Sequence, residues 1–285
     1  MSSVKSVISI CAQNFRKWAT DYRMWTIAAL LIIMTIIYAD NVHKNAAALN
    51  SDVSLWIFPF LYSSRYMKLV YTLPVVLMFC DAPFVDKNQT FVMMRTTRMK
   101  WLCGQILYII AASAVYYLFI FLLSVLSTVF IADFSSDWGR TFYTLANGGV
   151  VMPAEVPRIE ISLIVVEYFT PPQACFFTFL LSWFAGIFLG MVIFFLNLVT
   201  QNRYIGIVSS FAFVVWAFAV KETFGMGRFR KFSPISWNTL DRVDVGGLTT
   251  NPSFTYCVSV LSALIIFLIV GVFVFGRKKN FDFKE

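Results

Sequence analysis

Charged residues and histidine are scarce in this chain. Asp, Glu, Lys and Arg together make up 13% of its 285 residues, and there is a single histidine, His43. Soluble domains carry about 25% charged residues and roughly 45 to 50% apolar ones. Here hydrophobic residues make up 59% of the chain, and the mean hydropathy is +0.74. The composition excludes an ordinary water-soluble enzyme.

Residue patterns that carry catalysis are also missing. His43 lies beside Lys44 in the first expected outer loop, so the sequence offers neither a multi-histidine metal site nor a Ser-His-Asp triad. The acidic residues fall in loops or at the ends of apolar runs, which leaves no carboxylate pair at depth. No Walker-type phosphate-binding run is present. We therefore expect no catalytic residue, metal or cofactor in this chain, and any ATP and Mg²⁺ would be bound by a partner subunit.

Long apolar runs are what the sequence has instead. A helix needs about 20 mostly apolar residues to cross a hydrocarbon core that is roughly 30 Å thick. We predict an all-α, polytopic membrane protein with six transmembrane helices. The six runs are 24–39, 67–80, 101–131, 174–200, 204–220 and 254–275.

The net charge of +8 by itself would also fit a nucleic-acid-binding protein. Lys and Arg concentrate in the cytoplasmic loops of membrane proteins. With the N-terminus inside, the whole excess of +8 falls in the segments assigned to the cytoplasm, and the outer segments carry as many acidic as basic residues. The charge therefore indicates a multi-pass plasma-membrane protein with both termini inside, and no nucleic-acid partner.

This topology divides one transmembrane domain, residues 1–285, into five parts. They are a cytoplasmic amphipathic helix (1–23), the first two spans (24–80), a cytoplasmic helix (81–100), spans three to six (101–275) and a cytoplasmic tail (276–285).

Apolar residues before the first span recur at steps of three and four, as they do on one face of a helix. Cations fall largely on the other side, which predicts a helix lying in the inner membrane interface. A frayed basic leader is the alternative. The apolar positions are Val4, Val7, Ile8, Cys11, Phe15, Trp18 and Tyr22.

The segment 81–100, DAPFVDKNQTFVMMRTTRMK, predicts a short cytoplasmic helix. Phe91, Met94 and Arg95 share one face of it, and Arg98 follows one turn later. A helix this short cannot bury its own apolar face, so it suits a groove on a cytoplasmic partner. The alternative is that it lies in the interface and its cations only set the topology.

Three further features within the spans leave alternatives open. The amide of Asn197 fits interhelical packing or a substrate path. Cys175 and Cys257, both near outer span ends, fit small apolar packing or a disulfide. The pattern from Gly186 to Gly190 permits close approach of a second helix.

Together these features resemble the type-2 permease family of ATP-binding-cassette exporters. The resemblance covers essentially the whole length, and its most family-like text is RTTRMKWLCGQILYI, from Arg95 to Ile109. It implies two permease copies, or a permease and a homologue, with two ATPase subunits. Phe91, Met94, Arg95 and Arg98 would form the coupling helix. It also implies a path lined from the second and fifth spans by Tyr71, Phe79, Phe213 and Trp216. Asn197 of the fourth span joins these candidates only through the alternative given above for its amide.

The aromatic content, with 31 Phe, 12 Tyr and 8 Trp, suits amphipathic or hydrophobic cargo. We expect small peptides, such as the peptide toxins moved by exporters of the phenol-soluble-modulin type, antimicrobial peptides or lipid-like compounds. The alternative function is a membrane scaffold or assembly factor that transports nothing.

Overall fold

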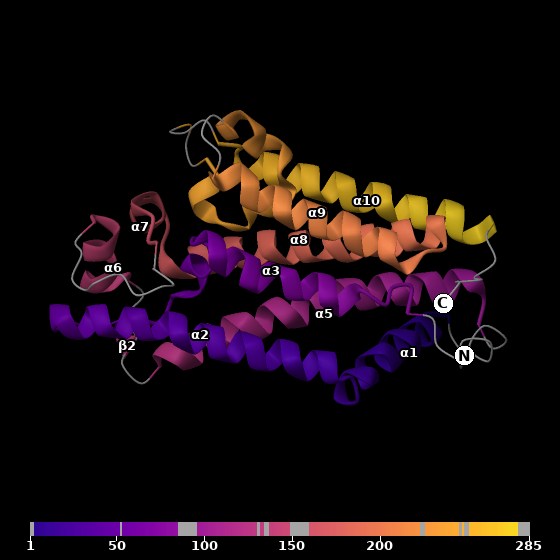
Figure 1. Cartoon of the computed structure of the whole chain (residues 1–285), viewed down its shortest axis with the longest axis horizontal. Helices are drawn as coiled ribbons and strands as arrows, with labels where there is room; N and C mark the ends of the chain where they lie inside the picture. The colour runs from indigo at the N-terminus through magenta and orange to yellow at the C-terminus, as the bar shows by residue number, and fades with distance from the viewer. Residues whose placement is uncertain are drawn as a thin grey trace.

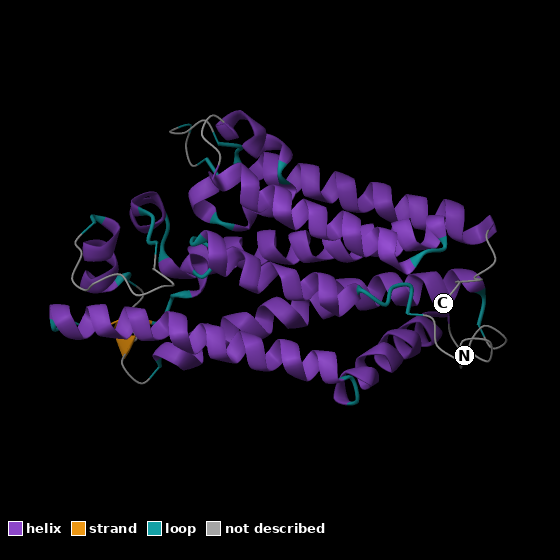
Figure 2. Cartoon of the chain, in the orientation of Figure 1, coloured by secondary structure: helices purple, strands orange, loops and turns teal. Residues whose placement is uncertain are grey.

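The structure is a computed structural model, and it describes residues 3–51, 53–84, 96–129, 132–133, 137–148, 160–222, 226–244, 247 and 251–278. Helices dominate it, and two very short strands are the exception (Figure 2). In chain order the elements are α1 (Ser3–Arg16), η1 (Lys17–Ala19), α2 (Tyr22–Leu49), β1 (Val53–Ser54), η2 (Phe58–Phe60), α3 (Arg65–Phe79), α5 (Arg98–Thr128), β2 (Ala132–Asp133), α6 (Gly139–Ala146), α7 (Leu163–Tyr168), α8 (Pro171–Thr200), α9 (Arg203–Glu222), η3 (Met226–Phe232), η4 (Pro234–Asn238), η5 (Leu240–Arg242) and α10 (Phe254–Lys278).

Five of the helices are long and apolar enough to cross a membrane: α2, α5, α8, α9 and α10. The second expected span is the short helix α3, which has 15 residues and contains Pro74. At about 1.5 Å per residue its length is about 22 Å, less than the hydrocarbon thickness. The described residues thus support a helical multi-pass membrane protein, and the count of six spans stays a prediction.

The first span is longer than the sequence predicted. We expected it to end at Ala39, but α2 continues to Leu49. His43 therefore lies in a helix and not in a loop, which corrects the prediction. An ion pair between Lys44 and Asp40 at 3.0 Å spans one helical turn, and the alanines at 46–48 favour the helical conformation. The helix therefore extends beyond the end of the apolar run.

The long helices lie side by side and alternate in direction along the chain (Figure 1). One end of the bundle holds α1, the α8–α9 turn and the last residues of α10, and we call it the α1 end. The other holds α6, α7 and the 3₁₀ segments η3 to η5, and we call it the α6 end. There β1 pairs in parallel with β2, Val53 opposite Ala132.

Helix α8 is the centre of the bundle, and α3, α5, α9 and α10 all pack on it. Two glycines permit this packing. A Cβ on Gly186 would lie 2.7 Å from the Tyr117 ring, and one on Gly190 would lie 2.7 Å from Ile109 and 2.8 Å from Phe79. The close helix approach predicted from these glycines is confirmed, and the partners are α5 and α3 of the same chain.

The α8–α9 hairpin depends on a third glycine. A Cβ on Gly206 would lie 2.7 Å from the carbonyl oxygen of Ile193 and 2.8 Å from its Cα. Backbone cannot rotate away as a side chain does, so α9 would have to shift.

We expect Gly206→Ala to lower the stability of the protein by about 1–3 kcal/mol, because it overpacks a backbone contact. Gly276→Ala is the matched control, since its new methyl group would meet mainly the ends of the Leu102 and Leu198 side chains. The midpoint of thermal unfolding in detergent measures both. Equal midpoints for the two variants would contradict the packing described for α9.

Candidate functional site

Polar side chains and backbone groups from several helices and turns converge at the α1 end, and we call this group the junction. Its members are Asn14, Trp18, Asp21, Arg23, Asp81, Ala82, Gln105, Tyr108, Asn197 and Gly206.

The first side of the junction fastens α1 to α5. Asn14 is 5% exposed, and its amide donates to the side-chain oxygen of Gln105 at 2.5 Å. The indole nitrogen of Trp18 donates to the Tyr108 hydroxyl at 2.8 Å. The helix predicted near the N-terminus is therefore present as α1, but it packs on the bundle through a buried amide pair, which its apolar periodicity did not reveal.

Arg23 joins the start of α2 to the end of α3. Asp21 is the N-cap of α2 and accepts from the backbone N–H of Arg23 at 3.0 Å. The Arg23 guanidinium donates to Asp21 at 2.9 Å and also to Asp81. A further nitrogen lies 2.9 Å from the sulfur of Cys80. One cation thus holds two carboxylates that are 60 residues apart in the chain.

Asn197 closes the junction from α8. Its Nδ2 donates to the carbonyl oxygen of Ala82 at 2.8 Å, and its Oδ1 accepts from the backbone N–H of Gly206 at 2.9 Å. The side chain is fully buried, so these two bonds satisfy an amide that would otherwise be costly. The Asn197 amide thus packs between two other segments of the chain, and its place on a substrate path stays a prediction.

Electrostatics at the junction follow from the ion pairs. Partial burial opposes the ionised form of Asp21, but its hydrogen bonds with Arg23 outweigh this and lower the pKa of the carboxyl. The junction therefore holds Asp21 in its ionised form beside the Arg23 guanidinium.

The predicted coupling residues are only partly within the described chain. Phe91, Met94 and Arg95 lie outside the described residues. Arg98 is the first residue of α5, and its guanidinium donates to the Arg277 carbonyl oxygen at 3.1 Å. The prediction of a separate helix through 100 is therefore wrong for its last three residues. They continue into the apolar run of α5, and the extended backbone of Thr97 precedes them.

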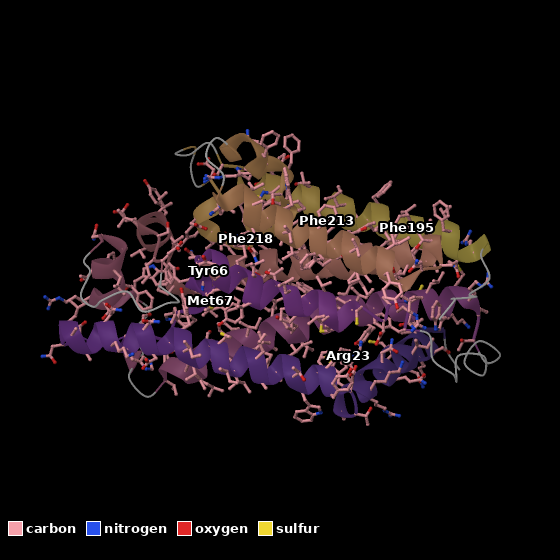
Figure 3. The ribbon with its side chains drawn as sticks, in the orientation of Figure 1. Arg23, Tyr66, Met67, Phe195, Phe213 and Phe218 are labelled. Atoms are coloured by element: carbon pink, nitrogen blue, oxygen red, sulfur yellow. The ribbon has the colours of Figure 1, made fainter. Side chains whose placement is uncertain are left out.

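The five predicted path residues do not converge on one cavity in the described part of the chain. Tyr71 and Phe79 are both buried on α3. Tyr71 bonds to Thr35 of α2 at 2.9 Å, whereas Phe79 lies against Tyr108 of α5 and Gly190 of α8. Phe213 packs on Phe188 with ring centres 5.2 Å apart. Phe213 and Trp216 on α9 therefore have different neighbours from Tyr71 and Phe79 on α3. Trp216 is 37% exposed, and Figure 3 labels Phe213 on α9.

One buried cation was not singled out from the sequence. Lys68 follows Met67 near the start of α3, and it is 4% exposed. Its Nζ donates to the Ser236 carbonyl oxygen and to the Thr239 hydroxyl, both at 3.1 Å. The signal was a lysine inside an apolar run, which marks an intramembrane position of interest. Figure 3 shows this part of α3 far from Arg23 along the bundle.

Within the part of the chain that the structure describes, the cysteines and the acidic residues form no further site. Cys175 and Cys257 are both buried and unbridged, in keeping with the packing alternative. The described residues contain no group of three His, Cys, Asp or Glu side chains that could hold a metal ion. Comparisons of the chain with known protein families, with curated proteins and with solved structures found no match.

We expect Arg23 and Asp81 to be energetically coupled across the junction. Arg23→Gln and Asp81→Asn should each lower the stability, and the double variant should lose less than the sum of the two. Because the Arg23 and Asp81 side chains are 34% and 48% exposed, we expect a coupling free energy of about 0.5–1 kcal/mol. A double-mutant cycle of unfolding midpoints in detergent measures it. Additive effects would contradict the bridge.

We also expect the contribution of Asp21 to the stability of the protein to depend on pH. A pKa that is lowered in the folded state gives stability that is complete above the ordinary Asp value of about 4 and is lost as pH falls through the lowered value. The difference in unfolding midpoint between the wild type and Asp21→Asn should stay constant from about pH 8 to 5 and shrink below about pH 4. The same substitution at exposed Asp137 controls for loss of a surface charge. A difference that persists unchanged at about pH 3 would rule out this linkage.

Proposed function

We propose that this chain is the membrane-spanning permease subunit of an ATP-binding-cassette exporter. A separate ATPase would bind ATP and Mg²⁺, and the cargo would be an amphipathic or hydrophobic compound, such as a small peptide. The proposal begins from the resemblance in sequence and takes its physical support from the junction.

The observation that carries the proposal is the position of residues 81–84. This turn is the described beginning of the 81–100 segment, the one expected to contact the ATPase. Asp81 is bonded to Arg23 of α2, Ala82 to Asn197 of α8, and the Phe84 ring lies 4.9 Å from that of Tyr108 on α5. A push on the segment would therefore reach three membrane helices directly. Such mechanical linkage is what a subunit driven by an external ATPase needs.

The arrangement of the ends is compatible with this assignment. The beginning of α1, the turn at 81–84 and the last residues of α10 lie together at the α1 end (Figure 1). In the proposed topology that end faces the cytoplasm, where the ATPase and the anionic headgroups of the inner leaflet would meet the cations.

A second copy, or a homologue, belongs to the proposal. Helix α9, which carries Phe213 and Trp216, also exposes an apolar stripe: Tyr204, Ile205, Val208, Phe211 and Val215. These positions recur along one face of the helix. We propose that part of this stripe contacts the second permease and that lipid covers the rest.

The test is co-purification from native membranes. We expect a P-loop ATPase to co-purify with the tagged wild-type chain and to hydrolyse ATP. The double variant Phe91→Asp with Arg95→Glu should reduce the amount of bound ATPase and the ATP hydrolysis at least tenfold, because it reverses a charge and removes an apolar contact. A matched pair at the opposite end is Tyr143→Asp with Arg140→Glu, both exposed on α6, and it should leave both unchanged.

Two outcomes would overturn the proposal. If the wild-type chain brings down no ATPase, the scaffold function is favoured. If the Phe91/Arg95 variant retains the ATPase and its activity, these residues do not form the coupling surface.

A further inference from the structure

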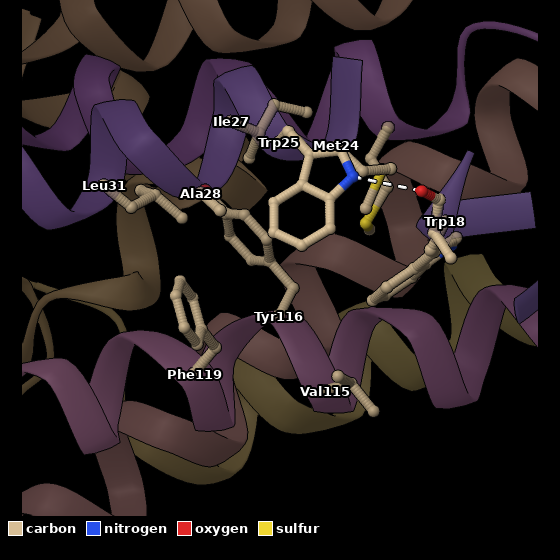
Figure 4. Close-up of a pocket in the computed structure, with 11 residues that line it drawn as sticks. Trp18, Met24, Trp25, Ile27, Ala28, Leu31, Val115, Tyr116 and Phe119 are labelled. Carbon is tan, nitrogen blue, oxygen red and sulfur yellow. Dashed lines mark hydrogen bonds between the residues drawn. The ribbon is translucent and has the colours of Figure 1, made fainter. Parts of the chain in front are cut away.

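A groove with a volume of about 280 Å³ lies between α2 and α5, beside the bend at which η1 leads into α2 (Figure 4). Each of the two helices supplies one wall. Ile27, Ala28 and Leu31 form the α2 wall, and Val115, Tyr116 and Phe119 form the α5 wall. The groove thus separates two helices that are otherwise in contact.

The groove offers only apolar surface to an occupant. None of the described residues that line it carries a charge, and its polar atoms already have partners. The indole nitrogen of Trp25 donates to the Ala19 carbonyl oxygen at 3.2 Å, as Figure 4 shows, and that of Trp18 donates at 2.8 Å to a tyrosine hydroxyl of α5. The Tyr116 hydroxyl donates to the Tyr71 carbonyl oxygen at 2.8 Å. A polar ligand would lose its hydrogen bonds with water here and gain none.

The mouth of the groove is continuous with the apolar surface that a membrane covers. Trp25 and Val115 line the groove and are 65% and 44% exposed. Exposed apolar side chains follow on both helices: Ile32, Ile33 and Ile36 on α2, and Leu118 and Leu122 on α5. An apolar surface of this kind on a helical multi-pass protein faces hydrocarbon. The molecules that reach the groove are therefore those of the bilayer.

The groove runs along α2 from the membrane border inwards. Trp18, Tyr22 and Trp25 lie around the bend, and Trp and Tyr concentrate at membrane interfaces. From Met24 to Leu31 the α2 side of the groove extends over about 10 Å, at about 1.5 Å per residue. This is less than half of the hydrocarbon thickness of about 30 Å. An occupant thus lies within one leaflet and along the helix, as a lipid acyl chain does.

Two methionines make the lining adaptable. Met24 of α2 and Met78 of α3 both border the groove. A methionine side chain has three rotatable bonds and fills irregular apolar gaps. Such a lining fits a flexible hydrocarbon chain better than one rigid molecule.

From these observations we infer that the groove binds one acyl chain of a membrane lipid and does not select its headgroup. The acyl chain enters from the leaflet on the α1 side and lies between α2 and α5. Its retention comes from close packing, because the tails of the bilayer are as apolar as the groove itself. This site requires only that the helices lie in a membrane, and it holds whether or not the protein serves an ATPase.

A bound acyl chain would affect the stability of the protein. It contacts α2, α5 and Met78 of α3 together, so it fills the space through which α2 could approach α5. A ligand that binds only the folded state stabilises that state by mass action. We therefore expect the lipid to raise the unfolding midpoint and to limit the movement of α2 relative to α5.

The probe is palmitoyl-oleoyl phosphatidylcholine, added to the full-length protein in detergent. Native mass spectrometry measures the fraction of protein that retains lipid after the excess has been removed. Palmitoyl-oleoyl phosphatidylglycerol should be retained equally, because the groove offers no charge to its headgroup. Dihexanoyl phosphatidylcholine has the same headgroup on short acyl chains, and its retention should be about tenfold lower because it makes fewer packing contacts.

Bulky substitutions test the position of the acyl chain. Ala28→Trp fills the groove from α2 and should lower retention about tenfold, since a closely packed groove cannot hold both groups. Ala29 is exposed and lies outside the wall, so Ala29→Trp should leave retention unchanged. Val115→Trp fills the groove from α5, with exposed Leu118→Trp as its control. This second pair decides the question if Ala28→Trp does not fold.

The outcomes separate the possible occupants. Retention that follows acyl-chain length and falls in the groove-filling variants supports the lipid site. A clear preference for phosphatidylglycerol, or equal retention of the dihexanoyl lipid, would overturn it, because the headgroup would then decide binding. Loss of no lipid in the groove-filling variants, or no lipid bound to the wild type, would also overturn it. A protein dimer that Ala28→Trp dissociates would show a second copy in the groove instead of a lipid.

Discussion

The bonds that Arg23 and Asn197 make at the α1 end are the constraint on which the rest of the structure depends. Both side chains are polar groups in a bundle made mainly of apolar helices, where an unpaired polar group costs free energy. Arg23 resolves this with Asp21 and Asp81, and Asn197 resolves it with the backbone of Ala82 and Gly206. The same residues 81–84 therefore receive bonds from both sides. This fixes where α3 ends relative to α2, α8 and α9.

Helices could be predicted well from the sequence, because an apolar run and its helical length are properties of a continuous segment. The runs at 174–200 and 254–275 correspond closely to α8 and α10. Helix ends were harder to predict. The extension of α2 beyond Ala39 depends on local helix preference and on the Asp40–Lys44 pair, and neither affects hydropathy. For α3 the error runs in the other direction: its apolar run predicts a membrane span, but the helix is too short to establish one.

The junction could not be predicted, because its contacts join distant parts of the chain. Asn14 and Gln105 are 91 residues apart, and Asn197 and the Ala82 carbonyl are 115 apart. Hydropathy identifies Asn197 as unusual but does not name its partner, so packing and substrate path remained alternatives. Lys68 is a similar case: its place in an apolar run was visible, but its partners Ser236 and Thr239 belong to a segment of mixed composition far along the chain.

The way in which the helices are held differs across the bundle, and this difference bears on how the chain could move. Helix α8 approaches α5 and α3 closely at Gly186 and Gly190, where side chains leave little room for sliding. Helix α2 contains no glycine. It packs on α3 and α5 through buried residues such as Ile27, Leu31 and Val42. Polar bonds tie it at separate points, Arg23 to Asp81 and Thr35 to Tyr71, and a groove lies between it and α5. Polar bonds at separate points permit a helix to tilt about them more readily than continuous close packing does. A displacement that begins at residues 81–84 would therefore pass to the start of α2 through Arg23 as well as to α8 through Asn197, and α2 could tilt about this point relative to α5.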